Sequence, residues 1–151
     1  MSICTAFENA KQQMKEKRWD YIYVAVDIHG TVFKPCYEKT ETYEYYPGAK
    51  ETLQMLSNSL KIKLIIWSAA KPEQLEKYRK KFLSDGIIFE YCNCNPEVVD
   101  TNIASFKEKF YFNVGLDDKF GFDPKYDWKN IATWLVCNGF SEKQLLSYPL
   151  L

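Results

Sequence analysis

The run of β-branched and aromatic residues from Tyr21 to Val26 restricts the chain to a small set of folds. Residues of these types favour a buried β-strand. The run ends on Asp27, and Gly30 follows closely and permits a sharp turn. In open α/β sheets, ligands bind at the carboxyl ends of the strands. We therefore expect Asp27 to lie at a ligand-binding edge of such a sheet.

The rest of the chain alternates helical and strand-like patterns. Apolar spacing predicts helices over residues 3–18, 49–60, 72–83 and 128–136. Apolar runs predict strands over residues 21–27, 62–67, 87–91 and 110–116. This alternation predicts the α/β class, as a Rossmann-like three-layer α/β/α sandwich with a central parallel sheet. Since 151 residues fit one domain, we expect a single domain over residues 1–151.

Residues 33–47 fit neither pattern. They are polar, are rich in Tyr, Thr, Glu and Lys, and lead into the pair Pro47-Gly48, which predicts a loop or a short flap beside Asp27. The flap tyrosines could stack a base or a sugar, and a hairpin packed on its own aromatic rings is at least as good an interpretation. These tyrosines are Tyr37, Tyr43, Tyr45 and Tyr46.

Charge and composition exclude several classes of partner. Twenty basic residues balance twenty acidic ones, so no global field attracts the chain to nucleic acid or to an anionic membrane. A nucleic acid end remains a conceivable substrate, but the net charge does not indicate it. No apolar stretch has the length of a signal peptide or a membrane span, and the five cysteines are an odd number. We expect a cytoplasmic protein with free thiols.

Polar side chains follow three of the predicted strands. Asp27 and Thr31 follow the first, Ser68 follows the second, and Asp117 and Asp118 follow the last. Taken singly, each is better explained as a helix cap, a turn residue or a solvated loop residue. Parallel strands bring their carboxyl ends to one edge, where crowded carboxylates repel one another unless a cation offsets their charge. Their oxygens favour Mg²⁺, and the joint pattern predicts a site.

Such a site has the parts that phosphoryl transfer requires. That reaction needs a nucleophile in line with the leaving group, a cation that offsets charge, and donors for the equatorial oxygens. The predicted cluster can supply all three, so the residues alone favour chemistry on a phosphate group.

The segment Val24–Val32 resembles motif I of the haloacid dehalogenase-like (HAD) phosphohydrolases, in which four hydrophobic residues precede Asp-x-Asp-Gly-Thr. Residues 64–68 resemble motif II, a strand that ends in Thr or Ser, and residues 114–118 resemble the acidic motif IV. The resemblance covers about residues 20–137. It implies an Mg²⁺-dependent phosphatase that hydrolyses phosphate monoesters through an aspartyl-phosphate on Asp27.

The resemblance also implies roles for individual residues. The carboxylate of Asp27, the backbone carbonyl of His29, and Asp117 or Asp118 would hold Mg²⁺. Thr31, Ser68 and Ala69 would bind the phosphate group. The motif III lysine, which neutralises the nucleophile and the phosphate, would be Lys107 or Lys109, and the pattern does not decide between them.

His29 replaces the second aspartate of motif I. In the family that aspartate protonates the leaving group and then activates water. An imidazole can perform both tasks near neutral pH. The alternative is a non-catalytic or regulatory HAD-like module that retains the phosphate pocket without acid/base chemistry.

The segments between the motifs are too short for the cap domain that many HAD enzymes carry. A capless site would favour a phosphate on a larger molecule, such as a nucleic acid end, a protein or a glycan, unless oligomerisation supplies a lid. The sequence does not identify that phosphorylated substrate.

Overall fold

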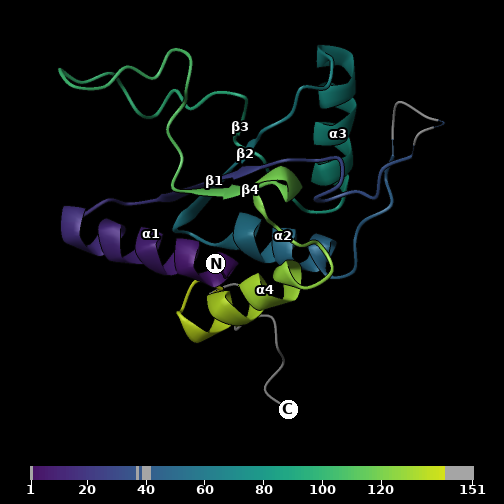
Figure 1. The fold of residues 1–151 in the computed structure, drawn as a ribbon, viewed down its shortest axis with the longest axis horizontal. Coiled ribbons are helices and arrows are strands. Elements are labelled where there is room, and N and C mark those ends of the chain that lie inside the picture. Colours follow the sequence, from purple (N-terminus) through teal and green to yellow (C-terminus); the bar gives the residue numbers. More distant parts are fainter. Residues whose placement is uncertain (1, 37, 39–41, 142–151) are drawn as a thin grey trace.

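Four parallel strands form one sheet in the computed structural model, which describes residues 2–36, 38 and 42–141 (Figure 1). The strands are β1 (Ile22–Val26), β2 (Ile62–Ile66), β3 (Tyr91–Cys92) and β4 (Val114–Leu116), and their order is β3-β2-β1-β4. Val26 at the end of β1 pairs with Ile66 in β2 and with Leu116 in β4. The chain therefore leaves these three strands at the same edge of the sheet.

Helices α1, α2 and α4 pack together on one face of this sheet. The helices are α1 (Ile3–Lys17), α2 (Ala49–Asn58), α3 (Pro72–Ser84) and α4 (Asp127–Cys137). Figure 1 shows α1, α2 and α4 gathered on one side of the strands, with α3 apart from them. Side chains such as Phe7, Leu53 and Trp128 are fully buried in the core that this layer forms with the sheet. The predicted Rossmann-like α/β sandwich with a central parallel sheet is confirmed.

Helix α3 packs mainly against aromatic side chains near the end of β1. Its buried residues Tyr78 and Phe82 contact the ring of Phe33, and Phe82 also contacts Phe89.

No helix in the described part of the chain is long and apolar enough to cross a membrane.

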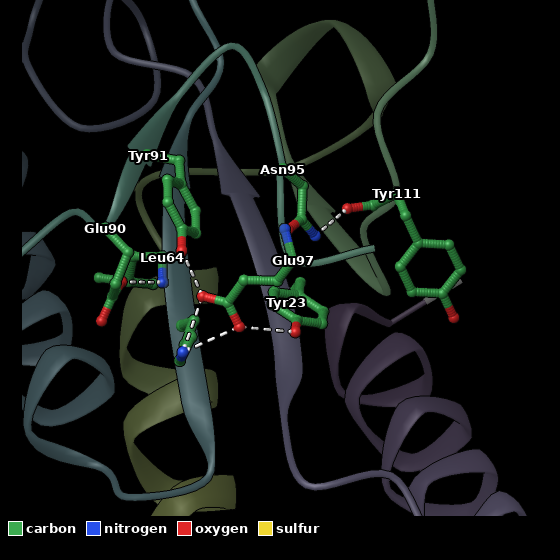
Figure 2. A network of polar contacts seen from close by, with 8 residues as sticks. Tyr23, Leu64, Glu90, Tyr91, Asn95, Glu97 and Tyr111 are labelled. Atoms are coloured by element: carbon green, nitrogen blue, oxygen red, sulfur yellow. Dashed lines mark hydrogen bonds and ion pairs between the residues drawn. The ribbon is translucent and has the colours of Figure 1, made fainter. Parts of the chain in front are cut away.

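The second face of the sheet is covered largely by the non-helical segment between β3 and β4. Ala25, Ile65 and Phe110 form a small separate apolar cluster there. Beside it, the carboxylate of Glu97 accepts hydrogen bonds from the hydroxyl groups of Tyr23 and Tyr91, at 3.0 and 2.6 Å (Figure 2). Glu97 therefore fastens the covering segment to β1 and β3.

β3 is shorter than the strand predicted over residues 87–91, and that prediction is wrong for its first four residues. The backbone N–H of Leu64 in β2 donates to the side-chain carboxylate of Glu90 at 2.7 Å (Figure 2). The Glu90 side chain thus takes the backbone donor of Leu64 that a neighbouring strand would otherwise use. Residue pairing between β2 and β3 therefore starts at Tyr91.

β4 is also shorter than the strand predicted over residues 110–116, and it starts at Val114. The side-chain oxygen of Asn113 accepts from the backbone N–H of Tyr23 at 2.8 Å and so takes the place of a strand carbonyl. The preceding residues Phe110 and Phe112 pack against the second face of the sheet instead of extending it.

Candidate functional site

Three aspartates meet at the carboxyl edge of the sheet. Asp27 follows β1, and Asp117 and Asp118 follow β4. One carboxylate oxygen from each lies within 4.8 Å of the other two. The backbone N–H of Asp27 donates to the carbonyl of Leu116 at 2.9 Å, which extends the pairing of the strands to the level of this acidic cluster. The structure thus brings together residues that lie ninety positions apart in the sequence.

The three carboxylates differ in exposure. Asp117 is buried, Asp27 is half-buried and Asp118 is exposed. The side chain of Asp117 is held in place because its oxygen accepts from the backbone N–H of Lys119 at 2.9 Å, at the start of the 3-10 helix η1 (Asp118–Phe120). The cluster therefore has a fixed buried side and a side open to solvent.

Thr31 joins the loop after β1 to the loop after β4. Its side-chain oxygen lies 3.0 Å from Asp27 Oδ2 and 3.3 Å from Asp118 Oδ1, and it accepts from the backbone N–H of Asp118 at 3.0 Å. Thr31 is fully buried, and its carbonyl accepts from Trp128 Nε1 of α4 at 2.9 Å. Helix α4 thereby anchors the loop that carries the predicted nucleophile. Since the hydroxyl is engaged by the protein, Thr31 orients the carboxylates in this structure.

Gly30 makes the close approach of the two loops feasible. Its φ is +80°, in the left-handed region that favours glycine. A Cβ atom at this position would lie 3.0 Å from Asp118 Oδ2, so a side chain would force that carboxylate to move. The left-handed φ is the main reason for a glycine at this position, and the close contact with the Asp118 carboxylate adds to it.

Burial raises the pKa of Asp27 to about 6, and the nearby charges of Asp117 and Asp118 add to this effect, while the hydrogen bond from Thr31 partly opposes it. None of the ion pairs between described residues includes these three carboxylates. A set of oxygen donors with uncompensated negative charge fits a hard divalent cation such as Mg²⁺. Asp27, Asp117 and Asp118 are the residues that could hold it.

The side chain of His29 contacts α3. Its Nε2 atom lies 2.6 Å from the hydroxyl of the buried Tyr78, and the two rings meet edge to face with centroids 5.3 Å apart. Burial lowers the pKa of His29. Among the described residues, the only group of carboxylate, thiol or imidazole side chains close enough to share a metal ion is the three aspartates, so the imidazole is not part of it. Tyr78 was not predicted, because a tyrosine in a helical pattern gives no sign of its contact with His29.

Ser68 lies at the same edge of the sheet, after β2. The backbone N–H of Trp67 donates to the carbonyl of Val26 at 2.9 Å, which aligns the two strand ends. The side chain of Asn93 bonds both the N–H and the carbonyl of Ser68, at 2.9 and 2.7 Å. Ser68 is half-buried, whereas Ala69 is exposed. Asn93 was missed, although an asparagine shortly after a predicted strand is a usual sign of the left-handed turn found here.

The structure distinguishes the two candidate lysines. Both Lys107 and Lys109 are exposed. Lys109, together with Asp117, lines a cavity of about 380 Å³, and Lys107 is not among the residues that line it. Lys109 is thus the better placed of the two to act beside the acidic cluster.

The flap tyrosines that the structure describes pack against protein. Tyr43 and Tyr45 both contact the ring of Phe33, with centroids 6.0 and 4.8 Å away. The hydroxyl of Tyr45 donates to Asp85 at 2.7 Å, and Tyr46 packs against the main core. Tyr37 lies outside the described residues. These contacts favour a hairpin packed on its own aromatic rings over a base-stacking platform.

Comparison with known proteins supports the fold. No protein-family model matches the chain, and no curated protein matches it. The chain is similar to the solved structure of a conserved protein from Bacteroides thetaiotaomicron, with a TM-score of 0.59 and 26% sequence identity. The match covers 84% of this chain and 98% of the other. The likeness therefore extends over nearly the whole of that protein and supports the α/β architecture described above.

Proposed function

We propose that this protein is an Mg²⁺-dependent HAD-like phosphatase that hydrolyses phosphate monoesters through an aspartyl-phosphate on Asp27. The observation that supports the proposal best is the convergence of Asp27, Asp117 and Asp118 within 4.8 Å, with Thr31 between them. A half-buried carboxylate at a strand end, beside two further acidic groups, suits both nucleophilic attack and metal binding.

The proposed reaction has two steps on Asp27. A carboxylate oxygen of Asp27 bonds to phosphorus, the ester P–O bond breaks, and the ester oxygen leaves with the electron pair and takes up a proton. Water then attacks phosphorus, the bond to Asp27 breaks, and inorganic phosphate is released. Because Thr31 lies 3.0 Å from Oδ2 of Asp27, we assign the attack to Oδ1. Mg²⁺ bound by the acidic cluster would offset the negative charge that carboxylates and phosphate bring together.

The other polar residues at this edge have assigned tasks in the proposal. Ser68 and the backbone at Ala69 hold the phosphate oxygens, and Lys109 offsets their charge. His29 is the acid/base group for the leaving group and for water, a role that requires its imidazole to release the hydroxyl of Tyr78. Since Asp118 is exposed, a phosphate on a large molecule can reach the cluster.

One observation favours a second candidate, a non-catalytic phosphate-binding module. The imidazole of His29 bonds to Tyr78 and is not part of the acidic cluster, so acid/base help at the phosphate would be absent if this contact persists. Loss of acid/base help alone slows a reaction about 10²- to 10⁴-fold. The phosphatase and the phosphate-binding module therefore differ in the expected rate of phosphate ester hydrolysis.

Turnover of phosphate esters tests the proposal. A screen with Mg²⁺ and with EDTA would cover nucleotides, sugar phosphates, aryl phosphates, phosphopeptides and phosphorylated DNA ends. We expect Mg²⁺-dependent hydrolysis that Asp27→Asn abolishes. Asp20→Asn, at an exposed position before β1, is the matched control and should retain the wild-type rate. Activity that survives in Asp27→Asn would exclude the nucleophile, and phosphate binding without any turnover would favour the second candidate.

A further inference from the structure

An aromatic cavity adjoins the acidic cluster on the second face of the sheet. Its volume is about 380 Å³, and Asp117 belongs both to its lining and to the cluster. Its aromatic walls are Trp67, Phe110, Phe112 and Phe120. Small-molecule sites are concave, mostly apolar and a few hundred Å³ in volume, with few polar groups. This cavity is at the small end of that range, which suits one or two rings.

Two of the aromatic wall residues are substantially exposed to solvent. Trp67 is 43% exposed and Phe120 is 73% exposed. Exposing large aromatic side chains is unfavourable, and where several gather around a concavity they mark a binding surface. Trp67 is held in position by the ring of Phe110, with centroids 5.6 Å apart.

The lining of the cavity includes two small residues in neighbouring strands. Ala25 lies in β1 and pairs with Gly115 in β4. A Cβ atom at Gly115 would lie 3.2 Å from the ring of Phe112, so the glycine lets that ring rest close to the sheet. These small residues thus let the aromatic rings pack close to the sheet beside the cavity.

The loops that build the cavity are the loops that build the candidate active site. Trp67 directly precedes Ser68, and Phe120 ends the 3-10 helix that begins at Asp118. Lys109, the cation assigned to the phosphate, also lines the cavity. A molecule whose phosphate sits on the acidic cluster can therefore place an adjoining group among these rings.

We propose, on the basis of the proposed function, that this cavity binds a flat aromatic ring on the alcohol or phenol half of the substrate. The preferred substrates are then phosphate monoesters of aromatic alcohols, phenols or nucleosides. Aromatic side chains stack on such rings and contact their edges, and Lys109 pairs with the phosphate beside them. Trp67 and Phe120 are the specificity-determining residues.

The test compares an aromatic with an aliphatic ester. Wild-type kcat/KM for 1-naphthyl phosphate should exceed that for glycerol 1-phosphate. In Phe120→Ala and in Trp67→Ala the ratio of the two kcat/KM values should fall roughly tenfold, the size of a lost stacking contact. Ile103→Ala, at a 96% exposed position in the segment between β3 and β4, is the control and should leave the ratio unchanged. Uridine monophosphate in place of naphthyl phosphate distinguishes a nucleobase from a phenolic ring as the bound group.

A binding measurement separates failure of this inference from failure of the proposed function. 1-Naphthol carries no phosphate, and we expect it to shift the amide NMR signals of Gly115 and Phe120. Shifts at these positions without hydrolysis of any ester would support the cavity and reject the phosphatase. Hydrolysis with an unchanged ratio in both variants, and no shift at either amide, would overturn the inference and leave the phosphatase standing.

Discussion

The two faces of the sheet are covered in different ways. On the first face, α1, α2 and α4 enclose a continuous core of buried side chains that includes Trp128. On the second face, an irregular segment is held by a small apolar cluster and by the hydrogen bonds of Glu97, and it leaves a cavity. Dense packing on one face stabilises the fold, and the thinner cover of the other leaves space for a ligand. Replacing side chains on each face tests this division.

The largest expected effect is on the helical face. Trp128→Ala should lower the free energy of unfolding by about 3–5 kcal/mol, because a fully buried indole leaves a cavity. Denaturant unfolding measures the change. Phe110→Ala on the second face should cost only about 1–2 kcal/mol, because that ring already borders a cavity. Equal losses of stability in the two variants would contradict this division between a densely packed face and a thinly covered one.

The acidic edge between the faces should respond to Mg²⁺. At a hundredfold excess over its dissociation constant, the ion should stabilise the folded protein by about 2.7 kcal/mol, seen as a higher Tm. The double variant Asp117→Asn/Asp118→Asn should lose most of this increase in Tm. Asp100→Asn, at an exposed position in the segment between β3 and β4, should keep it. A Tm increase of the same size in all three proteins would show that Mg²⁺ binds elsewhere.

The hydrogen bonds of Glu97 to the second face of the sheet should make the free energy of unfolding depend on pH. Burial disfavours the charged form of Glu97, but hydrogen bonds from Lys63, Tyr91 and Tyr23 outweigh it and hold its pKa below the usual value. A lowered pKa contributes stability that is complete above the unfolded-state pKa of about 4.3 and is lost as the pH falls through the folded value. Glu97→Gln should therefore cost about 1–3 kcal/mol at pH 7 and progressively less below pH 4.

The control for that experiment is an exposed ion pair. Lys34 and Glu44 lie 3.1 Å apart, with Glu44 72% exposed. Glu44→Gln should change the free energy of unfolding by less than about 1 kcal/mol at any pH. If Glu97→Gln behaves in the same way across the pH range, the Glu97 network does not hold the second face.

A small effect on stability is expected at Gly30. Gly30→Ala should cost about 1–2 kcal/mol, because its φ of +80° is unfavourable for alanine. The added Cβ would also crowd Asp118 Oδ2, so the Mg²⁺-induced increase in Tm should shrink. Gly86→Ala is the matched control, since it has φ +76° and open space around the new Cβ. It should lose similar stability while keeping the response to Mg²⁺.

The sequence predicted the features that local patterns determine. Apolar spacing located the four helices to within a few residues, and the order of strands and helices gave the parallel sheet. The predicted meeting of Asp27 with Asp117 follows from that topology, because neighbouring parallel strands end at one edge.

The features that the sequence did not reveal depend on tertiary contacts. Glu90 and Asn113 shorten two strands because their side chains replace backbone acceptors, and no local pattern shows this. The contact of His29 with Tyr78 and the exposure of Phe120 beside the cluster arise only when distant segments meet. His29, Tyr78 and Phe120 therefore account for the differences between the predicted site and the site in the structure.

The most direct test of the account is the covalent state of Asp27 during turnover. The protein would be mixed with an aryl phosphate and Mg²⁺, quenched rapidly in acid and digested, and its peptides analysed by mass spectrometry. We predict one added phosphoryl group on Asp27, and none on that peptide when EDTA replaces Mg²⁺. Turnover with the phosphoryl group on another residue, or with none on Asp27 in a quench fast enough to precede its hydrolysis, would contradict the account.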